Sequence, residues 1–300
     1  MQKASVHIAA VVSMIFWGFS FILSKIVFEF YTPLTTVFFR LLISTIFLFL
    51  VILLARHFEK INPKDIWLFI AGAFFNPFLY FLCENYGLER VSASVSAIII
   101  STIPVFAPFV AFKIFGEKLT VINIIGLIIS FLGLMLILFN CQFQLDASPI
   151  GIALLFLAVF SAVVYTVFLK KLSFKYSPIT IISWQNLIGV VFFLPLFIIY
   201  DYKEVIQIIP GRTTIISLLS LGILCSSLAY VLFTYSIKHL GISKSNLYTN
   251  LIPVIASIAA FFILKEGFTL QKISGIAIVI LGVLLSQQSM TGKIFKRKRS

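Results

Sequence analysis

The amino-acid sequence predicts an all-α integral membrane protein, with ten transmembrane helices arranged as two inverted-topology repeats of five. Three observations predict this fold class: the composition, the length of the apolar segments and a motif that occurs twice. Of the 300 residues, 61% are hydrophobic and only 11% are charged, which is too little charge to cover a soluble core of this size. Apolar runs of about 20 residues, the length that crosses a bilayer core, recur from end to end. The chain therefore has no sizeable soluble domain.

The apolar segments follow one another at regular intervals. Ten can be drawn, centred near residues 17, 44, 76, 104, 129, 160, 188, 224, 253 and 279. The first, HIAAVVSMIFWGFSFILSKIV, is followed by Glu29 rather than by a small-residue cleavage site, so we interpret it as a retained helix and not a signal peptide. Polar connectors separate the segments, as at 56–65, 141–149, 170–178 and 201–212. Helix is expected throughout, because a lipid-exposed backbone has to satisfy its hydrogen bonds internally.

The basic residues set the predicted orientation. If the ten segments alternate across the membrane, sixteen Lys and Arg lie on the N-terminal side and six on the other, with Arg40 inside a span. Positive charge favours the cytoplasmic side, so both termini are expected in the cytoplasm of a cell (inner) membrane. This also explains the net charge of +13 and the tail KIFKRKRS (293–300) without nucleic acid, with contact to anionic membrane lipid as an additional role.

The repeated motif shows how the chain is divided. IPVFAPFVAFKIFGEKLT (103–120) recurs as IPVIASIAAFFILKEGFT (252–269), at an offset of 149 residues. Earlier in each half the offset is 145, since YTP (31–33) corresponds to YSP (176–178). The predicted repeats are residues 1–145, helices one to five, and 146–300, helices six to ten with the basic tail. Five is odd, so the second repeat enters the membrane in the opposite sense, which is typical of secondary transporters.

Several residues together carry a family resemblance. They are Phe16, Trp17 and Gly18 in the first helix, Phe39 and Arg40 in the second, ENYGLERVSAS (84–94) at the end of the third, and the repeated motif itself. Over essentially its whole length, the chain resembles the drug/metabolite transporter superfamily, EamA type. No single motif is very specific, but their order and twofold recurrence are. The resemblance implies a proton- or gradient-driven carrier, often an exporter, of amino acids or other small metabolites.

Other functions remain open at this point. Within transport, these are uptake and a purine, sugar or nucleotide-sugar substrate. An integral membrane enzyme acting on lipid-linked substrates would need paired acidic or histidine residues at one interface, and none is found. No residues have metal-ligand spacing, and no cofactor is expected. Cys83, Cys141 and Cys225 have neither metal nor disulfide spacing. A channel would show a ring built by subunit symmetry rather than two halves within one chain.

Two ionisable residues within predicted spans are the leading site candidates. Arg40 and Glu84 both lie toward the outer ends of their helices, while their repeat counterparts, Gln185 and Phe233, are uncharged. A charge at the bilayer centre costs about 2.5–3.5 kcal/mol on insertion scales, so such residues usually have a function. One hypothesis is that Arg40 binds a carboxylate and Glu84 a cationic group or a proton. The alternative is an ion pair that ties helices two and three together.

Further candidates for substrate binding are polar or aromatic residues near these positions. Tyr80 lies one turn before Glu84 on the same face, and Trp184 adjoins Gln185. The remaining candidates are Trp17, Gln185, Asn186, Tyr230, Asn246 and Asn250.

The glutamate of the repeated motif is interpreted as structural. Glu117 and Glu266 fall on opposite membrane faces, so each is expected to cap or brace the turn into its next helix, with Thr120 or Thr269 as N-cap. Gly126 and Gly133, like Gly275 and Gly282, lie seven residues apart on one helix face. These faces are expected to pack within the monomer or to form a homodimer contact.

Overall fold

The computed structural model describes residues 2–56, 58–106, 121–138, 147–240, 245, 247–267 and 269–291. Within these residues the chain is helical and has no strand. Six helical spans are long and apolar enough to cross a membrane, beginning at Ala4, Pro33, Pro63, Pro149, Pro178 and Arg212. Four shorter apolar helices complete the set: Ala93–Phe106, Ile124–Leu138, Tyr248–Ile263 and Leu270–Leu285. The predicted fold class of ten helical spans in two repeats is confirmed.

The first half contains α1 (Gln2–Val27), α2 (Pro33–Leu54), η1 (Pro63–Asp65), α3 (Ile66–Ala73), η2 (Phe74–Leu79), α4 (Tyr80–Arg90), α5 (Ala93–Ile100) and α7 (Val121–Leu138). The second half contains α8 (Pro149–Ser173), α9 (Pro178–Tyr200), α10 (Tyr202–Val205), α11 (Arg212–Ser220), η3 (Leu221–Leu228), α12 (Ala229–Leu240), η4 (Leu247–Asn250), α14 (Leu251–Ile263) and α15 (Leu270–Thr291). The third span of each half, α3–η2–α4 and α11–η3–α12, contains a π-helical segment, η2 or η3, at the equivalent place.

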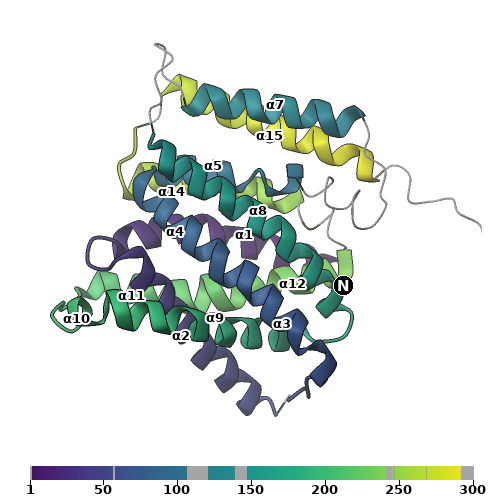
Figure 1. The fold of residues 1–300 in the computed structure, drawn as a ribbon. Coiled ribbons are helices and arrows are strands. Elements are labelled where there is room, and N and C mark those ends of the chain that lie inside the picture. Colours follow the sequence, from purple (N-terminus) through teal and green to yellow (C-terminus); the bar gives the residue numbers. More distant parts are fainter. Residues whose placement is uncertain are drawn as a thin grey trace, which may run out of the picture.

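Helix pairing across the molecule follows a pseudo-twofold axis. Helix α2 packs along α9, its own counterpart, and α7 packs along α15, also its counterpart. Helix α4 packs along α8, and the equivalent pair, α12 and α1, is also in contact. In the same way the contact between α1 and α14 is matched by that between α8 and α5. Figure 1 shows α7 and α15 side by side at one edge of the bundle.

The glycine faces of α7 and α15 meet each other within the chain. A Cβ added at Gly282 would lie 2.3 Å from Ser130 N and 2.7 Å from Gly126 O, and one at Gly133 would lie 2.7 Å from Val279 N. The two backbones are therefore in direct contact, as small residues permit between helices in lipid. Of the two roles expected for these faces, packing within the monomer is the one observed.

Hydroxyl side chains begin several helices, and proline often follows them. Thr32, Ser148 and Ser177 each accept a hydrogen bond from the backbone N–H three residues later, and each precedes a proline at the first helical position. This combination satisfies an unpaired N–H and presets the helical φ. Thr269 accepts from Lys272 N at 3.2 Å, so the predicted N-cap at Thr269 is confirmed.

The repeated glutamate in the second half caps a helix of the first half. Glu266 Oε1 accepts from Ala93 N at 2.8 Å, and Oε2 accepts from Ser94 Oγ at 2.6 Å. The expectation that Glu266 braces its own next helix is therefore wrong: its carboxylate caps the start of α5, because pseudo-twofold packing brings that helix end beside it. Glu117 and Thr120 lie outside the described residues.

Other acidic residues join the two halves at both ends of the bundle. At the end where α10 lies, Asp201 accepts hydrogen bonds from Thr32 and Thr35 at the start of α2. At the end where α1 begins, Glu59 Oε2 accepts from Ser177 N at 2.9 Å and from Ser177 Oγ at 2.8 Å, at the start of α9. In each contact an acidic residue of one half binds the start of the second helix of the other half, which is α2 for Asp201 and α9 for Glu59.

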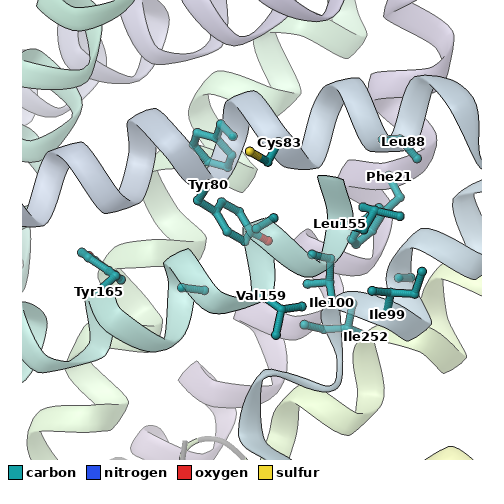
Figure 2. Close-up of a cluster of buried hydrophobic side chains, with 14 of the residues drawn as sticks. Phe21, Tyr80, Cys83, Leu88, Ile99, Ile100, Leu155, Val159, Tyr165 and Ile252 are labelled. Atoms are coloured by element: carbon teal, nitrogen blue, oxygen red, sulfur yellow. The ribbon is translucent and has the colours of Figure 1, made fainter. Parts of the chain in front are cut away.

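A continuous apolar core lies between these two ends. Buried side chains from α1, α2, α4, α5, α8, α9 and α14 belong to one cluster. Figure 2 shows part of it, with Tyr80 projecting from α4 into the space near Ile100 and Ile252. Many polar side chains are also buried within the bundle, and a group of them lines the central cavity that forms the candidate site.

Candidate functional site

One cavity lies at the centre of the bundle, with walls from both halves. Its lining comes from α1, α2, η2, α4 and α5 of the first half and from α8, α12, η4 and α14 of the second. The centre of a water molecule can reach about 90 Å³ of this space. By that measure one ordered water needs about 10–15 Å³, so the cavity has room for several waters or for a small solute.

Arg40 lies on the cavity wall and is almost fully buried, with 2% of its surface exposed. Its Nε donates to Ser226 Oγ of η3 at 2.8 Å. Its guanidinium carbon lies 4.2 Å from the ring centroid of Phe81. A cation over an aromatic face is stabilised by about 0.5–2 kcal/mol. Arg40 is thus held by one hydroxyl and one ring, and no carboxylate of the described residues forms an ion pair with it.

Glu84 lines the same cavity and is also buried. Tyr80 Oη donates to Glu84 Oε1 at 2.7 Å, as their spacing of four residues along α4 allows. Within the described part of the chain, the ion pairs are Arg90–Glu89 and Lys175–Asp65. The alternative of an ion pair between Arg40 and Glu84 is therefore not what the structure shows. Each of the two residues has a separate neutral partner.

Aromatic side chains form the wall between α1 and α12. The ring centroid of Trp17 lies 4.9 Å from those of both Tyr230 and Phe233, in edge-to-face arrangements. Trp17 Nε1 also donates to Cys225 O at 3.2 Å, which fixes the orientation of the indole. Tyr230 is the hydrogen-bond partner of Asn76, whose Nδ2 donates to its hydroxyl at 3.4 Å. This wall can contact an apolar group or a cation.

Half of the ten predicted site residues line the cavity: Trp17, Arg40, Tyr80, Glu84 and Tyr230. Gln185 does not line the cavity itself, but its Oε1 accepts a hydrogen bond from the hydroxyl of the lining residue Tyr165 at 2.8 Å. Trp184 does not line the cavity, because its side chain is 37% exposed and packs against Phe49 on the outside of the bundle. Successive residues on a helix point about 100° apart, so adjacency to Gln185 carried no information about direction.

The asparagines are placed differently from one another. Asn186 is buried away from the cavity wall, where its Nδ2 donates to Ser44 Oγ at 2.7 Å and to Ser226 O at 3.1 Å. Asn186 therefore does not line the cavity, and it contacts Ser226, the residue that bonds Arg40. Asn250 is buried beside the lining residue Thr249, and its amide has no hydrogen-bond partner among the described residues. Asn246 lies outside the described residues.

Sequence reasoning missed several lining residues. Asn76 and Thr249 are polar residues within apolar spans, so a search for every intramembrane polar side chain would have found them. The lining residue Phe81 carried no such signal, because it is one of 34 phenylalanines. Ser226, which does not line the cavity but bonds Arg40, carried none either, because it lies in a serine-rich stretch. Among the described residues, no three His, Cys, Asp or Glu side chains are grouped closely enough to hold a metal ion.

Comparisons with known proteins agree with this architecture. The model of the EamA-like transporter family matches residues 4–139 and 149–287. An uncharacterized transporter of Archaeoglobus fulgidus is 27% identical over 93% of this chain and 97% of its own. The uncharacterized transporter YetK of Bacillus subtilis is 28% identical over 95% of this chain and 87% of its own.

A solved crystal structure shares the fold, with a TM-score of 0.71 and 13% identity over 95% of this chain and 99% of its own. The family matches cover most of both halves, and the cavity lies between those halves. The chain therefore belongs to the EamA-like transporter family of membrane transporters.

Proposed function

We propose that this protein is a secondary-active transporter that exports amino acids or similar small metabolites by alternating access. One observation carries the proposal: Arg40 and Glu84 line the same central cavity, and each is buried and bonded to a neutral partner. Buried charges are costly unless they have a partner. A solute that carries both an anionic and a cationic group would give each of them an ion pair, which neither forms with the described residues.

The two charged residues have different expected roles. Arg40 binds the carboxylate of the solute, because a guanidinium offers several N–H donors in the geometry of a planar anion. Glu84, with Tyr80 bonded to one carboxylate oxygen, binds the ammonium group or takes up the coupling proton. Trp17 and Tyr230 contact the remainder of the solute.

Alternating access follows from the inverted repeats. Two related halves of opposite orientation can rock about a central site and expose it to either face in turn. The hydrogen bonds of Asp201 with α2 and of Glu59 with Ser177 join the halves at opposite ends of the bundle. Hydrogen bonds to charged groups are worth about 1.5–3 kcal/mol each, so a few of them can exchange as the halves move.

The direction, substrate class and location in this proposal have other support. Outward transport of amino acids rests on the family resemblance. Placement in the cell membrane with cytoplasmic termini rests on the excess of Lys and Arg on the N-terminal side.

The test is uptake into proteoliposomes that contain the full chain. Twenty L-amino acids and the nucleobases are offered singly, with and without a pH gradient, and empty liposomes serve as the control. We expect at least one amino acid to accumulate, and to accumulate faster with the gradient. If no solute crosses while a lipid-linked substrate is consumed, the protein is a membrane enzyme and the proposal is wrong.

A further inference from the structure

The two π-helical segments occupy equivalent places in the two halves, but their surroundings differ in chemistry. At the offset of 149, Ser226 in η3 corresponds to Pro77 in η2. At the offset of 145, Asn186 in α9 corresponds to Leu41 in α2, and Ser44 in α2 to Gly189 in α9. The contacts among α2, α9 and η3 therefore have a counterpart in the contacts among α9, α2 and η2.

We name the first set, made of Arg40, Ser44, Asn186, Ser226 and Ser227, the polar junction. All five side chains are at least 95% buried. Asn186 Nδ2 donates to Ser44 Oγ at 2.7 Å and to Ser226 O at 3.1 Å. The Ser44 and Ser227 hydroxyls are 2.6 Å apart, and Ser227 Oγ donates to Gly222 O at 2.8 Å. Because the Ser227 hydroxyl donates its one proton to Gly222 O, it can only accept from Ser44, so Ser44 is the donor in that hydrogen bond. The chain of hydrogen bonds therefore has one direction, from Asn186 to Gly222.

The counterpart, made of Leu41, Pro77 and Gly189, is apolar. A Cβ added at Gly189 would lie 2.5 Å from Pro77 Cγ and 3.2 Å from Leu41 Cδ1, so these residues are in close contact. Gln185, the counterpart of Arg40, bonds Tyr165 instead of this junction. The same fold thus packs without any hydroxyl or amide at this place. In the polar junction Ser226 bonds Arg40, whereas Gln185, the counterpart of Arg40, bonds no residue of the apolar junction.

Two contacts fix the guanidinium of Arg40. Its Nε is engaged by Ser226 Oγ at 2.8 Å, and its carbon lies 4.2 Å from the ring centroid of Phe81. The ring restricts tilting of the guanidinium plane, and the hydroxyl restricts rotation within that plane. With Nε engaged, the donors left for a solute are the two terminal nitrogens, which together match both oxygens of a carboxylate.

We propose that Ser226 is a positioning residue that presents Arg40 end-on to a planar carboxylate, and that Asn186 supports it by holding the Ser226 backbone. This inference rests on the proposed function, in which Arg40 binds the anionic group of the solute. It assigns Ser226 and Asn186 to recognition through Arg40 and not to direct contact with solute.

The experiment compares the full chain with Ser226→Ala, Ser226→Thr and Arg40→Gln in proteoliposomes. The probes are the twenty L-amino acids and their amides, which lack the carboxylate. We expect Ser226→Ala to raise KM for transported amino acids about tenfold with kcat within twofold, because uniform binding is lost. Ser226→Thr keeps the hydroxyl and should restore KM. Ser183→Ala is the control, because the equally buried Ser183 Oγ donates only within its own helix, to Ile179 O at 2.6 Å.

A second measurement does not depend on transport. In protein labelled with ¹⁵N-arginine, the buried Nε–H of Arg40 should exchange slowly with water, and Ser226→Ala should accelerate this exchange while Ser226→Thr does not. If Ser226→Ala leaves both KM and the exchange rate unchanged, or lowers kcat alone, Ser226 does not position Arg40. If Arg40→Gln itself transports normally, the proposed role of Arg40 fails, which is a different result.

Discussion

The contact between Glu266 and the start of α5 gives a prediction whose size follows from the structure. Glu266→Ala removes a carboxylate that accepts from Ala93 N at 2.8 Å, from Ser94 Oγ at 2.6 Å and from Ser94 N at 3.3 Å. Loss of a capping side chain costs about 0.5–2 kcal/mol, and loss of a negative charge at a helix N-terminus costs about 0.3–1 kcal/mol. Because Glu266 is half-buried, solvent screens part of this energy, and we expect a net loss of about 1–2 kcal/mol.

The assay is thermal unfolding of the purified protein in detergent, followed by tryptophan fluorescence. A loss of this size lowers the melting temperature by roughly 2–6 °C for a chain of this length. Glu266→Gln keeps one acceptor oxygen and should show a smaller decrease. Glu29→Ala, at an exposed glutamate near the same end of the bundle, is the control. If Glu266→Ala melts at the temperature of the native protein, the carboxylate does not join the two halves and the reasoning is refuted.

Two further predictions concern helix packing and the opposite end of the bundle. Gly282→Ala should lower the melting temperature, because its Cβ would lie 2.3 Å from Ser130 N and would force α7 and α15 apart, at a cost of about 1–3 kcal/mol. Gly267→Ala is the control, because a Cβ there meets nothing within 4 Å and the melting temperature should not change. Tyr176→Phe should cost about 0.5–1.5 kcal/mol in detergent unfolding, because its hydroxyl accepts from Asn62 N at 3.0 Å and donates to Asp65 at 2.9 Å. Equal stability of Tyr176→Phe and the exposed control Tyr200→Phe would contradict that contact.

The lengths of the apolar segments and the internal repeat predicted the fold, because both can be found in the sequence without knowledge of how the helices pack. Apolar length identifies a span without knowledge of its neighbours, and two offsets relate the halves without knowledge of their packing. The Tyr80–Glu84 hydrogen bond was predictable for the same reason, since four residues along a helix return to one face.

The contacts between halves were not predictable in this way. Arg40 and its partner Ser226 are 186 residues apart, and Glu266 and Ala93 are 173 residues apart. The sequence around one residue of each pair does not identify its partner, because the pairing depends on how the helices pack against one another. Trp184 is a further example, because two residues that are adjacent in the sequence can point in different directions. Trp184 is next to Gln185 in the chain, but its side chain lies on the outside of the bundle.

The central claim is that Arg40 and Glu84 bind the transported solute within one cavity. The most direct measurement is the uptake rate of the double variant Arg40→Gln/Glu84→Gln in proteoliposomes, compared with the native chain and with Trp184→Phe. Each lost charged hydrogen bond is worth about 1.5–3 kcal/mol, a factor of about 10–150. We expect uptake by the double variant to fall at least tenfold at unchanged folding, while Trp184→Phe stays active. Normal uptake by the double variant would contradict the claim.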